Sequence, residues 1–599
     1  MSGICGFCNF KADYVRQKDG HEYLLERMKG ALAHRGGGRN VIRCFLGLSG
    51  GFARDGYVIL CDADIFNTEE LRHLLEAKGF VCQTSDEAEV ILGCYLHYGN
   101  DCANMLNGAF AFVIWNEAQE SGPLFLCRDR LGVKPLFYTC VRDTIVFASE
   151  MKALFEFPGV KAVLDNEGLR EIFGLFPSRT AGNAVLKNIY EIKPGHNAVY
   201  KDNRLAEQKY WDVVSQPNDF TRAEAVAHVR YLVEDAVKRQ MRADVPLCTF
   251  LSGGLDSSII TAIAAREYAK EGRTLDTFSF DYAENETHFT ANSYQSDTDR
   301  KWAEQVAALT KTNHTHIVCG VKDLASCLYP AVTARDLPGM ADIDASLLYF
   351  CREVGQTHRI ALTGEGADEL FGGYPWFHDE AALTGAAFPW IRQLDFRKSL
   401  LSPVLAQELD LEAYAAQAYQ NSVAAMPLPE NDENAQEHHL RIMTYLNMKW
   451  VMANLIERTE RMGAHVSFLG RMPYADYRLV EFLWNMPWQF KCVGAPKNLL
   501  RDAFADLLPD ALINRRKNPF PKIYHPLYAR LLNAKMTQIL NDPSSPLLPL
   551  INIQAFEDFL TLPPNTAKPW YGQLMAGPQL IAFYIQIDYW LRQYNVTVS

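Results

Sequence analysis

The sequence predicts an α+β domain built on packed sheets, followed by an α/β domain with a parallel sheet and a helical C-terminal extension. Three observations lead to this prediction. Short apolar segments with strand character dominate the first 200 residues. From residue 245 such segments alternate with helical ones, which is typical of a parallel sheet with crossover connections. After residue 375 almost every segment has the helical period.

The composition is that of a globular protein. Of the 599 residues, 48% are hydrophobic, 22% are charged and 12% are aromatic, so the chain can bury large cores and is not disordered as a whole. The length suggests about two to four domains. The net charge of −12 argues against a nucleic-acid scaffold and against a polybasic membrane binder.

No stretch suggests a membrane span or a secretion signal. The best apolar candidate, 580–591, is shorter than the roughly 18–20 residues of a span, and the N-terminus has no basic segment followed by an apolar one. The 14 cysteines lie scattered in apolar segments, as buried reduced thiols do. For the single CxxC motif, Cys5 and Cys8, we expect a structural role over metal or redox chemistry. A cytoplasmic location follows as an expectation.

The first domain is expected to cover residues 1–205. Its strands are predicted at 4–10, 57–61, 109–115, 124–127 and 144–148, and its helices at 22–33 and 68–78. Residues 206–222 are polar and irregular and are interpreted as a linker. The second domain then covers 223–599, and Thr221 is expected to cap a helix that reaches Arg239.

The second domain is predicted to open with a strand, a loop and a helix. Strand 245–251 is apolar, residues 252–258 read SGGLDSS, and the helix covers 259–270. Further strands are predicted at 275–280, 315–319 and 359–363, with helices between them.

The SGGLDSS loop is predicted to bind a nucleotide. Its glycines let backbone N–H groups approach a phosphate, the helix that follows adds its positive end, and the serines add hydroxyl donors. Asp256 would repel a phosphate, and a Mg²⁺ ion bound between the two groups usually offsets this repulsion. A plain glycine turn between a strand and a helix is the alternative.

A second loop is predicted at the same edge of the sheet. Residues 362–374 read LTGEGADELFGGY, so three carboxylates lie within five residues among four glycines. Glu365 and Asp368 are candidates for a general base and a second metal ligand. The alternative is a helix N-terminus that carries acidic residues, which is common.

These two loops, in this order, resemble the PP-loop synthetase domain of the asparagine synthetases. Residues 497–501, KNLLR, resemble the KxxLR motif of that family, and 508–509 and 515–521 resemble the segments that follow it. In the first domain, 106–112, 128–136 and 147–150 resemble the class II glutamine amidotransferase domain. The resemblance implies an N-terminal-nucleophile fold, an αββα sandwich, followed by a PP-loop α/β domain.

The resemblance also implies a reaction. A carboxylate attacks the α-phosphate of ATP to give an acyl-AMP and pyrophosphate, and an amine then forms the amide. Lys497 would stabilise phosphate charge, Asp256 and Asp368 would hold Mg²⁺, and Glu365 would act as a base towards the amine. The implied catalytic residues are Lys497, Glu365 and Asp256, and the implied ATP-binding residues are Leu251, Ser252, Gly253, Gly254, Asp256, Ser257, Ser258, Ser279, Gly364 and Glu365.

Three features of the first domain depart from the family and predict an inactive glutaminase. Family members carry a nucleophilic cysteine after the initiator methionine, but Ser2 stands at that place, and Cys5 could act only after removal of four residues. Asp62-Ala63 replaces an Asn-Gly pair that cradles the oxyanion, and a carboxylate would repel that charge. Gly37-Gly38 replaces Pro-Asp, and the segment that carries the glutamine-binding arginine is shortened between residues 44 and 57.

The synthetase part departs less from the family. Residues 458–464, RTERMGA, resemble RxDRMSM with altered polar positions, and Leu469 stands where a glutamate is usual. The absence of this carboxylate suggests a substrate other than free aspartate. The alternative is that the leucine is a structural replacement for which neighbouring residues compensate. The polar segment 281–299 is compatible with a lid over the nucleotide and with an ordinary surface loop.

The sequence therefore predicts an ATP-dependent amide ligase whose nitrogen does not come from glutamine. The favoured function is intramolecular amide formation of the lasso-peptide macrolactam type, with a precursor peptide and a leader protease as partners. The second is synthesis of asparagine from aspartate, ATP and ammonia or glutamine. A non-catalytic binding protein is the third, and the acidic residues and Lys497 of the site argue against it. No nucleic-acid or membrane partner is expected, and a homodimer is compatible with the sequence.

Overall fold

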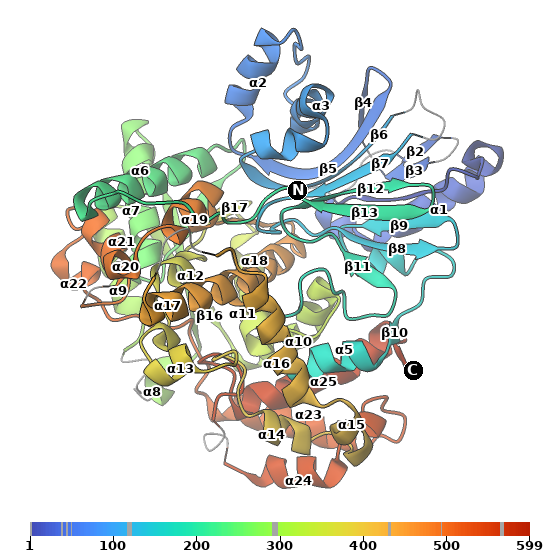
Figure 1. Cartoon of the computed structure of the whole chain (residues 1–599). Helices are drawn as coiled ribbons and strands as arrows, with labels where there is room; N and C mark the ends of the chain where they lie inside the picture. Colours follow the sequence, from blue (N-terminus) through green and yellow to red (C-terminus); the bar gives the residue numbers. More distant parts are fainter. Residues whose placement is uncertain are drawn as a thin grey trace. The chain divides into compact units, whose positions relative to one another are not determined.

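The computed structural model describes residues 3–36, 40–43, 46–49, 51–116, 122–289, 297–428, 433–492, 494–563 and 568–599 (Figure 1). The chain divides into two compact units. The first consists of Met1–Asp165, Thr180–Asp212 and Val596–Ser599, and the second of Asn166–Arg179 and Val213–Asn595. Of the segment 206–222 that was interpreted as a linker, 206–209 belong to a strand and 222 begins a helix, whereas 210–221 form neither helix nor strand.

The first unit contains two six-stranded antiparallel sheets. The first sheet has the order β11 (Ile189–Glu191), β8 (Phe137–Val141), β9 (Thr144–Ala148), β1 (Cys5–Cys8), β3 (Leu46–Ser49), β2 (Asn40–Arg43). The second has the order β13 (Arg204–Lys209), β12 (His196–Lys201), β7 (Leu124–Arg128), β6 (Gly108–Asn116), β5 (Tyr57–Ile65), β4 (Phe52–Arg54). The main helices are α1 (Lys18–Ala31), α2 (Thr68–Ala77) and α3 (Glu87–Tyr98).

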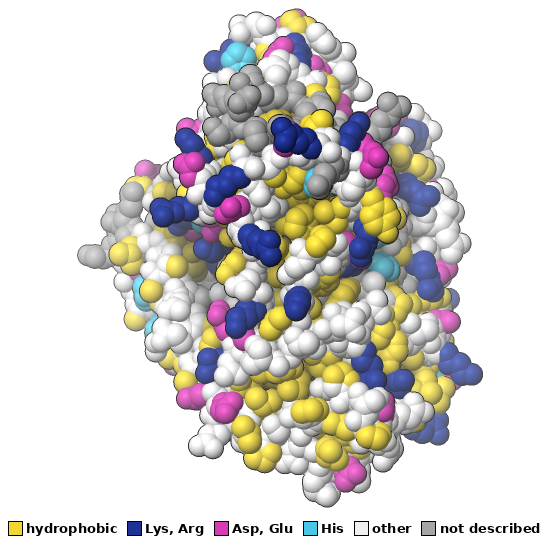
Figure 2. Space-filling view, turned by 90° about the vertical axis from the view of Figure 1, so that its right-hand side faces the viewer, with side chains coloured by type: hydrophobic (Ala, Val, Ile, Leu, Met, Phe, Trp, Pro, Cys, Tyr) yellow, Lys and Arg dark blue, Asp and Glu magenta, His cyan; other side chains and the backbone are white. Residues whose placement is uncertain are grey.

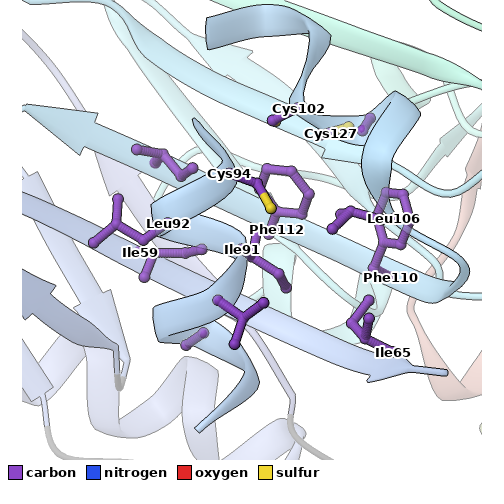
Figure 3. Close-up of a cluster of buried hydrophobic side chains, with 14 of the residues drawn as sticks. Ile59, Ile65, Ile91, Leu92, Cys94, Cys102, Leu106, Phe110, Phe112 and Cys127 are labelled. Atoms are coloured by element: carbon purple, nitrogen blue, oxygen red, sulfur yellow. The ribbon is translucent and has the colours of Figure 1, made fainter. Parts of the chain in front are cut away.

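The two sheets share a core because their strands turn alternate apolar side chains towards each other. Val58 and Leu60 of β5 lie in one cluster with Ile145 and Phe147 of β9 in the other sheet. Ile59, between them in sequence, lies on the opposite face with the buried residues of α2 and α3 (Figure 3). Helix α1 lies against β1 and β3. This layering is the predicted αββα sandwich, and every predicted strand of the first domain is present.

The second unit is built on a parallel sheet of five strands. Its order is β16 (Asn313–Cys319), β15 (Asp276–Tyr282), β14 (Leu247–Phe250), β17 (Ile360–Leu362), β18 (Leu469–Arg471). The chain runs outward from β14 in one direction to β15 and β16, and in the other to β17 and β18. The loops after β14 and β17 therefore meet at the point where the direction changes, which is where open α/β sheets bind ligands.

Helices surround this sheet and fill the rest of the unit. They include α6 (Arg222–Gln240), α7 (Leu255–Lys270), α8 (Asn285–His288), α9 (Arg300–Thr310), α10 (Val321–Arg335), α11 (Asp342–Val354), α12 (Ala367–Phe371), α16 (Leu411–Ala424), α17 (Ala435–Leu446), α18 (Ala453–Ala464), α19 (Tyr477–Trp484), α21 (Asn498–Ala503), α23 (Pro526–Leu540), α24 (Ile553–Thr561) and α25 (Gly577–Gln593). Thr221 caps α6 as predicted, in a capping box with Glu224. Among the described helices, none has the length and apolarity that a membrane crossing requires. On the face in Figure 2, basic and acidic side chains are interspersed with hydrophobic ones.

Loss of charge at two buried aspartates at the start of α11 should change the free energy of unfolding in opposite directions. Asp342 is 1% exposed, and burial raises its pKa to about 6 although Gln579 Nε2 donates to it at 3.1 Å. Because the folded state favours the protonated acid, the free energy of unfolding falls as the pH rises from about 4 to about 6. We expect Asp342→Asn to raise the free energy of unfolding by about 2–3 kcal/mol at pH 8 and to change it little at pH 4.

Asp344 provides the matched control for this prediction. Its carboxylate accepts from Arg335 Nη1 at 2.9 Å, and the Arg335 side chain is itself buried. Asp344→Asn weakens the pairing of a buried cation and should lower the free energy of unfolding by about 1–3 kcal/mol at pH 8. Urea titrations of both variants at pH 4 and pH 8 measure the two effects. An Asp342→Asn protein that gains no stability between pH 4 and pH 8, relative to the unsubstituted chain, contradicts the prediction.

Candidate functional site

The loops after β14 and β17 border a cleft of ≈ 320 Å³ in the second unit. Its lining includes charged and hydroxyl groups as well as aromatic and aliphatic side chains. Segments 496–501 and 515–521 line it together with 571–575, far from the two loops in sequence. The cleft therefore lies where the order of the sheet predicts a ligand.

The SGGLDSS loop adopts a tight turn at the N-terminus of α7. Gly253 has φ +70°, and a Cβ there would lie 2.5 Å from the backbone nitrogen of Ala303 on α9. The Oγ of Ser252 accepts from the N–H of Gly254 at 3.2 Å and lies 3.1 Å from Ser257 Oγ. The loop is thus held by its own side chains, with backbone N–H groups and the positive end of α7 available to an anion.

Two aspartates and two lysines form a partly buried charge cluster beside this loop. Lys497 Nζ lies 2.5 Å from Asp256 Oδ2 and 2.5 Å from Asp368 Oδ1, and Lys517 pairs with the other oxygen of Asp368. Burial works against charge on Asp368, but the two lysines outweigh it and hold its pKa well below the usual range. Burial and the neighbouring Asp368 raise the pKa of Asp256 in spite of Lys497. Gly373 leaves room for the cluster, because a Cβ there would collide with Asp368.

The carboxylates of this cluster fit a divalent cation. Asp256 Oδ1 and Glu365 Oε2 are buried, and within the described parts of the chain neither has a hydrogen-bond donor. Free carboxylate oxygens are the ligands that Mg²⁺ prefers. Asp256 and Asp368 would hold the ion, which would supply charge neutralisation for the phosphates of a nucleotide.

Glu369 is buried in the second loop and pairs with Tyr374 at the end of that loop. Tyr374 Oη donates to Glu369 Oε1 at 2.6 Å, and the Nζ of Lys517 lies 4.7 Å from the centre of the Tyr374 ring. Burial, with the nearby charge of Asp368, raises the pKa of Glu369 to about 7. Glu365 also lines the cleft, and its Oε2 has no hydrogen-bond donor among the described residues.

Arg515 ties the nucleotide loop to the far side of the cleft. Its Nη1 donates to the carbonyl of Ser252 at 3.2 Å and its Nη2 to Asp299 Oδ1 at 2.5 Å, while the guanidinium lies over the ring of Trp302. Asp297 accepts from Asn518 at 3.1 Å. The end of segment 281–299 is therefore part of the wall of the cleft, whereas residues 290–296 lie outside the described residues. Arg515 and Lys517 have no predicted role in the site, although three adjacent basic residues at 515–517 are a signal in the sequence for a cation-rich site.

The structure brings most of the predicted site residues together. The cleft is lined by Leu251, Ser252, Gly254, Asp256, Ser257, Ser279, Gly364, Glu365, Asp368 and Lys497. Two predicted ATP-binding residues do not line it: Gly253 forms the turn, and Ser258 is buried in α7 at 1% exposure. The aromatic residues of the lining, among them Trp376, Trp390 and Tyr571, were not predicted. In the sequence they resemble ordinary core residues.

A buried charge cluster stands in the first unit where the family resemblance expects an oxyanion hole. Asp62 of β5 is fully buried; Arg35 Nη1 lies 3.3 Å from one of its oxygens and Lys134 Nζ 3.1 Å from the other. Arg35 also pairs with Glu150. Cys5 lies in β1 at 0% exposure. Ser2 and Gly37-Gly38 lie outside the described residues.

One further group of possible metal ligands lies outside the cleft. Glu284, His288 and His525 bring one ligand atom each within 4.8 Å of one another. The backbone N–H of Leu527 donates to His525 Nδ1 at 3.1 Å, so the proton of the neutral ring is on Nε2, which faces Glu284 at 3.3 Å. The His525 ring is therefore arranged for a hydrogen bond to Glu284 rather than for a metal.

Comparison with known proteins assigns a family to each of the two parts of the chain. The family model for asparagine synthase matches residues 228–592, and the model for a glutamine amidotransferase domain matches 51–211. The chain is 40% identical to the glutamine-hydrolysing asparagine synthetase 3 of Bacillus subtilis (strain 168), over 100% of both chains. It is 27% identical to asparagine synthetase 1 of the same organism, over 86% of this chain and 87% of that one, and 26% identical to amidase chyE of Penicillium rubens, over 77% and 76%. The chain belongs to the asparagine synthase family, and it is an ATP-dependent carbon–nitrogen ligase.

Proposed function

We propose that the second unit activates a carboxylate as an acyl-AMP and passes it to ammonia or to an amine, and that the first unit does not hydrolyse glutamine. The observation that carries the first part is the cluster of Asp256, Asp368 and Lys497 beside the nucleotide loop. The buried ion pairs of Asp62 support the second part.

In the proposed reaction a carboxylate oxygen attacks the α-phosphorus of ATP and pyrophosphate leaves. Lys497 and the N–H groups at the start of α7 offset the charge that develops on the phosphates. The nitrogen then attacks the acyl carbon, AMP leaves, and the nitrogen loses a proton. Glu365 is the proposed acceptor of that proton, because its Oε2 is buried and has no donor among the described residues.

We propose the loss of glutaminase activity because Asp62 brings a negative charge to the place where the oxyanion would form. A glutaminase must stabilise an oxyanion with hydrogen-bond donors. Asp62, at the place of the family's asparagine, is an acceptor and already pairs with Arg35 and Lys134. Together with Ser2 in place of the cysteine, this leaves neither a nucleophile of the family type nor a neutral donor.

Two carboxylate substrates remain candidates. The first is an acidic side chain of a peptide that closes on the peptide's own amine, a lasso-type macrolactam, which would require a precursor peptide and a leader protease. The aromatic residues in the lining of the cleft favour it. The second is free aspartate with ammonia, which gives asparagine. The 40% identity to an asparagine synthetase over the full length favours the second.

Nitrogen-source assays test this proposal. We expect amide product with ammonium or with an amine-bearing substrate, no product with glutamine, and no release of glutamate. Ser2→Ala should leave the product rate within about twofold of the unsubstituted enzyme, because the residue has no chemical role. Glutamine-dependent product that disappears in Ser2→Ala would contradict the loss of glutaminase activity.

A further inference from the structure

Arg515 joins three segments that meet at the nucleotide loop. Its Nη1 donates to the carbonyl of Ser252 at 3.2 Å, and its Nη2 donates to Asp299 Oδ1 at 2.5 Å. Asp299 is the residue before α9, and the guanidinium lies 5.1 Å from the centre of the Trp302 ring in the first turn of that helix. One side chain therefore contacts the loop after β14 and the start of α9 at the same time, from a third segment.

The nucleotide loop lies directly against the first turn of α9. A Cβ on Gly253 would lie 2.5 Å from the backbone nitrogen of Ala303 and 2.5 Å from the carbonyl carbon of Trp302. The N–H groups of Trp302 and Ala303 both donate to the carbonyl of Asp299 at 3.0 Å, so this turn begins at the same aspartate that pairs with the guanidinium. A displacement of Asp299 would therefore move the surface on which Gly253 packs.

Further hydrogen bonds hold the segment before α9 in place. Asn518 Nδ2 donates to the carbonyl of Asp297 at 2.7 Å, and Trp302 Nε1 donates to the Oδ2 of the same aspartate at 2.6 Å. The side chains of Arg515 and Asp299 are only 3% and 11% exposed, so water competes little for their ion pair. These contacts favour a fixed wall over a lid for the described residues just before α9.

We propose that Arg515 is a positioning residue for the nucleotide loop. Its bonds to Asp299 and to the Ser252 carbonyl hold the start of α9 against the loop, which sets the place of the loop relative to a bound phosphate. A lysine cannot replace it, because an ammonium lacks the planar fork that reaches a carboxylate and a carbonyl together. This inference rests on the proposed use of the loop for ATP and deepens it.

Direct binding of three probes tests this role. The measurement is isothermal titration calorimetry of Mg-ATP, pyrophosphate and adenosine with the unsubstituted enzyme and with Arg515→Lys. We expect Kd for ATP and for pyrophosphate to rise about tenfold in the variant, because both carry phosphates, and Kd for adenosine to change less than twofold.

The possible results separate this inference from the proposed function. Kd values for ATP and pyrophosphate that stay within twofold in Arg515→Lys would show that a positive charge suffices, which overturns the positioning role. An equal loss of affinity for all three probes would show a general distortion of the cleft and overturns it as well. An unsubstituted enzyme that binds neither ATP nor pyrophosphate overturns the proposed use of the loop, and this inference with it.

Arg397→Lys is the matched control. Arg397 is also buried, its Nη1 donates to the carbonyl of Gly174 at 3.3 Å, and its guanidinium lies 4.9 Å from the centre of the Trp570 ring. It does not line the cleft. The control should leave all three Kd values within twofold, and a rise equal to that in Arg515→Lys overturns the role of Arg515.

Asp299→Asn tests the partner of Arg515. It keeps the shape of the side chain and removes the charge that holds the guanidinium, so we expect Kd for ATP and pyrophosphate to rise about threefold. Combined with Arg515→Lys it should add no further rise, because both changes break the same contact. Effects of the two substitutions that multiply would show that they act independently, which overturns their shared role.

Discussion

Lys497→Met is expected to lower ATP–pyrophosphate exchange by about 10³-fold. Lys497 is the one side chain that contacts both Asp256 and Asp368 in the described part of the site, and it is 4% exposed. Methionine keeps the aliphatic stem and removes the cation, so two partly buried carboxylates face each other without their common partner. Negative phosphates then have to enter a site that has lost positive charge.

Lys491→Met is the matched control for Lys497→Met. Lys491 is equally buried, but it does not line the cleft; its Nζ donates to the carbonyl of Leu483 at 3.1 Å. Burial lowers its pKa to about 8, so the charged form disfavours folding below that pH. Lys491→Met should therefore keep its exchange activity and lose no stability at pH 7. Exchange by Lys497→Met within tenfold of the unsubstituted enzyme would show that the cluster is structural.

Gly253→Ala is expected to raise KM for ATP by about 10²-fold, because a displacement of about 1 Å in a binding loop has effects of this size. The φ of +70° disfavours alanine by about 1–2 kcal/mol. The new Cβ would also lie 2.5 Å from backbone atoms of Trp302 and Ala303. A backbone cannot move aside as a flexible side chain does, so the loop itself must shift. The measurement is the ATP dependence of exchange, together with the thermal midpoint of unfolding.

Gly272→Ala separates the effect of the positive φ from the effect of the close contact with α9. Gly272 also has φ +70°, but a Cβ there would meet nothing within 4 Å. This variant carries the backbone strain alone, at the end of the same helix. It should lower the thermal midpoint by a few degrees and leave KM for ATP unchanged. If Gly253→Ala behaves in the same way, the close approach of α9 has no part in shaping the loop.

Local signals in the sequence account for much of the fold and of the nucleotide end of the site. The SGGLDSS loop could be predicted because glycine, serine and a following helix each restrict the backbone locally. The three-residue strand β18 was missed, since it stands alone in a helical region. Helix α3 was missed because residues 88–94 are all buried, so its sequence does not alternate between apolar and polar residues with the helical period.

The aromatic part of the lining depends on contacts between distant segments, which a local pattern cannot express. Trp390 and Tyr571 are 181 positions apart, and the backbone bridge between Ile391 and Tyr571 brings their segments together. Likewise, Lys517 acquires its role from Asp368, which lies 149 positions away. Sequence motifs that resemble a family can name the segments, but the pairing of these side chains had to come from the structure.

The ion pairs of Asp62 tie this position to the charge balance in the interior of the first unit. Asp62→Asn would remove the negative charge that Arg35 and Lys134 share, while Arg35 keeps its ion pair with Glu150. A change at position 62 therefore alters the environment of two buried cations at once, so the proposed loss of glutaminase activity would not be reversed by that substitution alone.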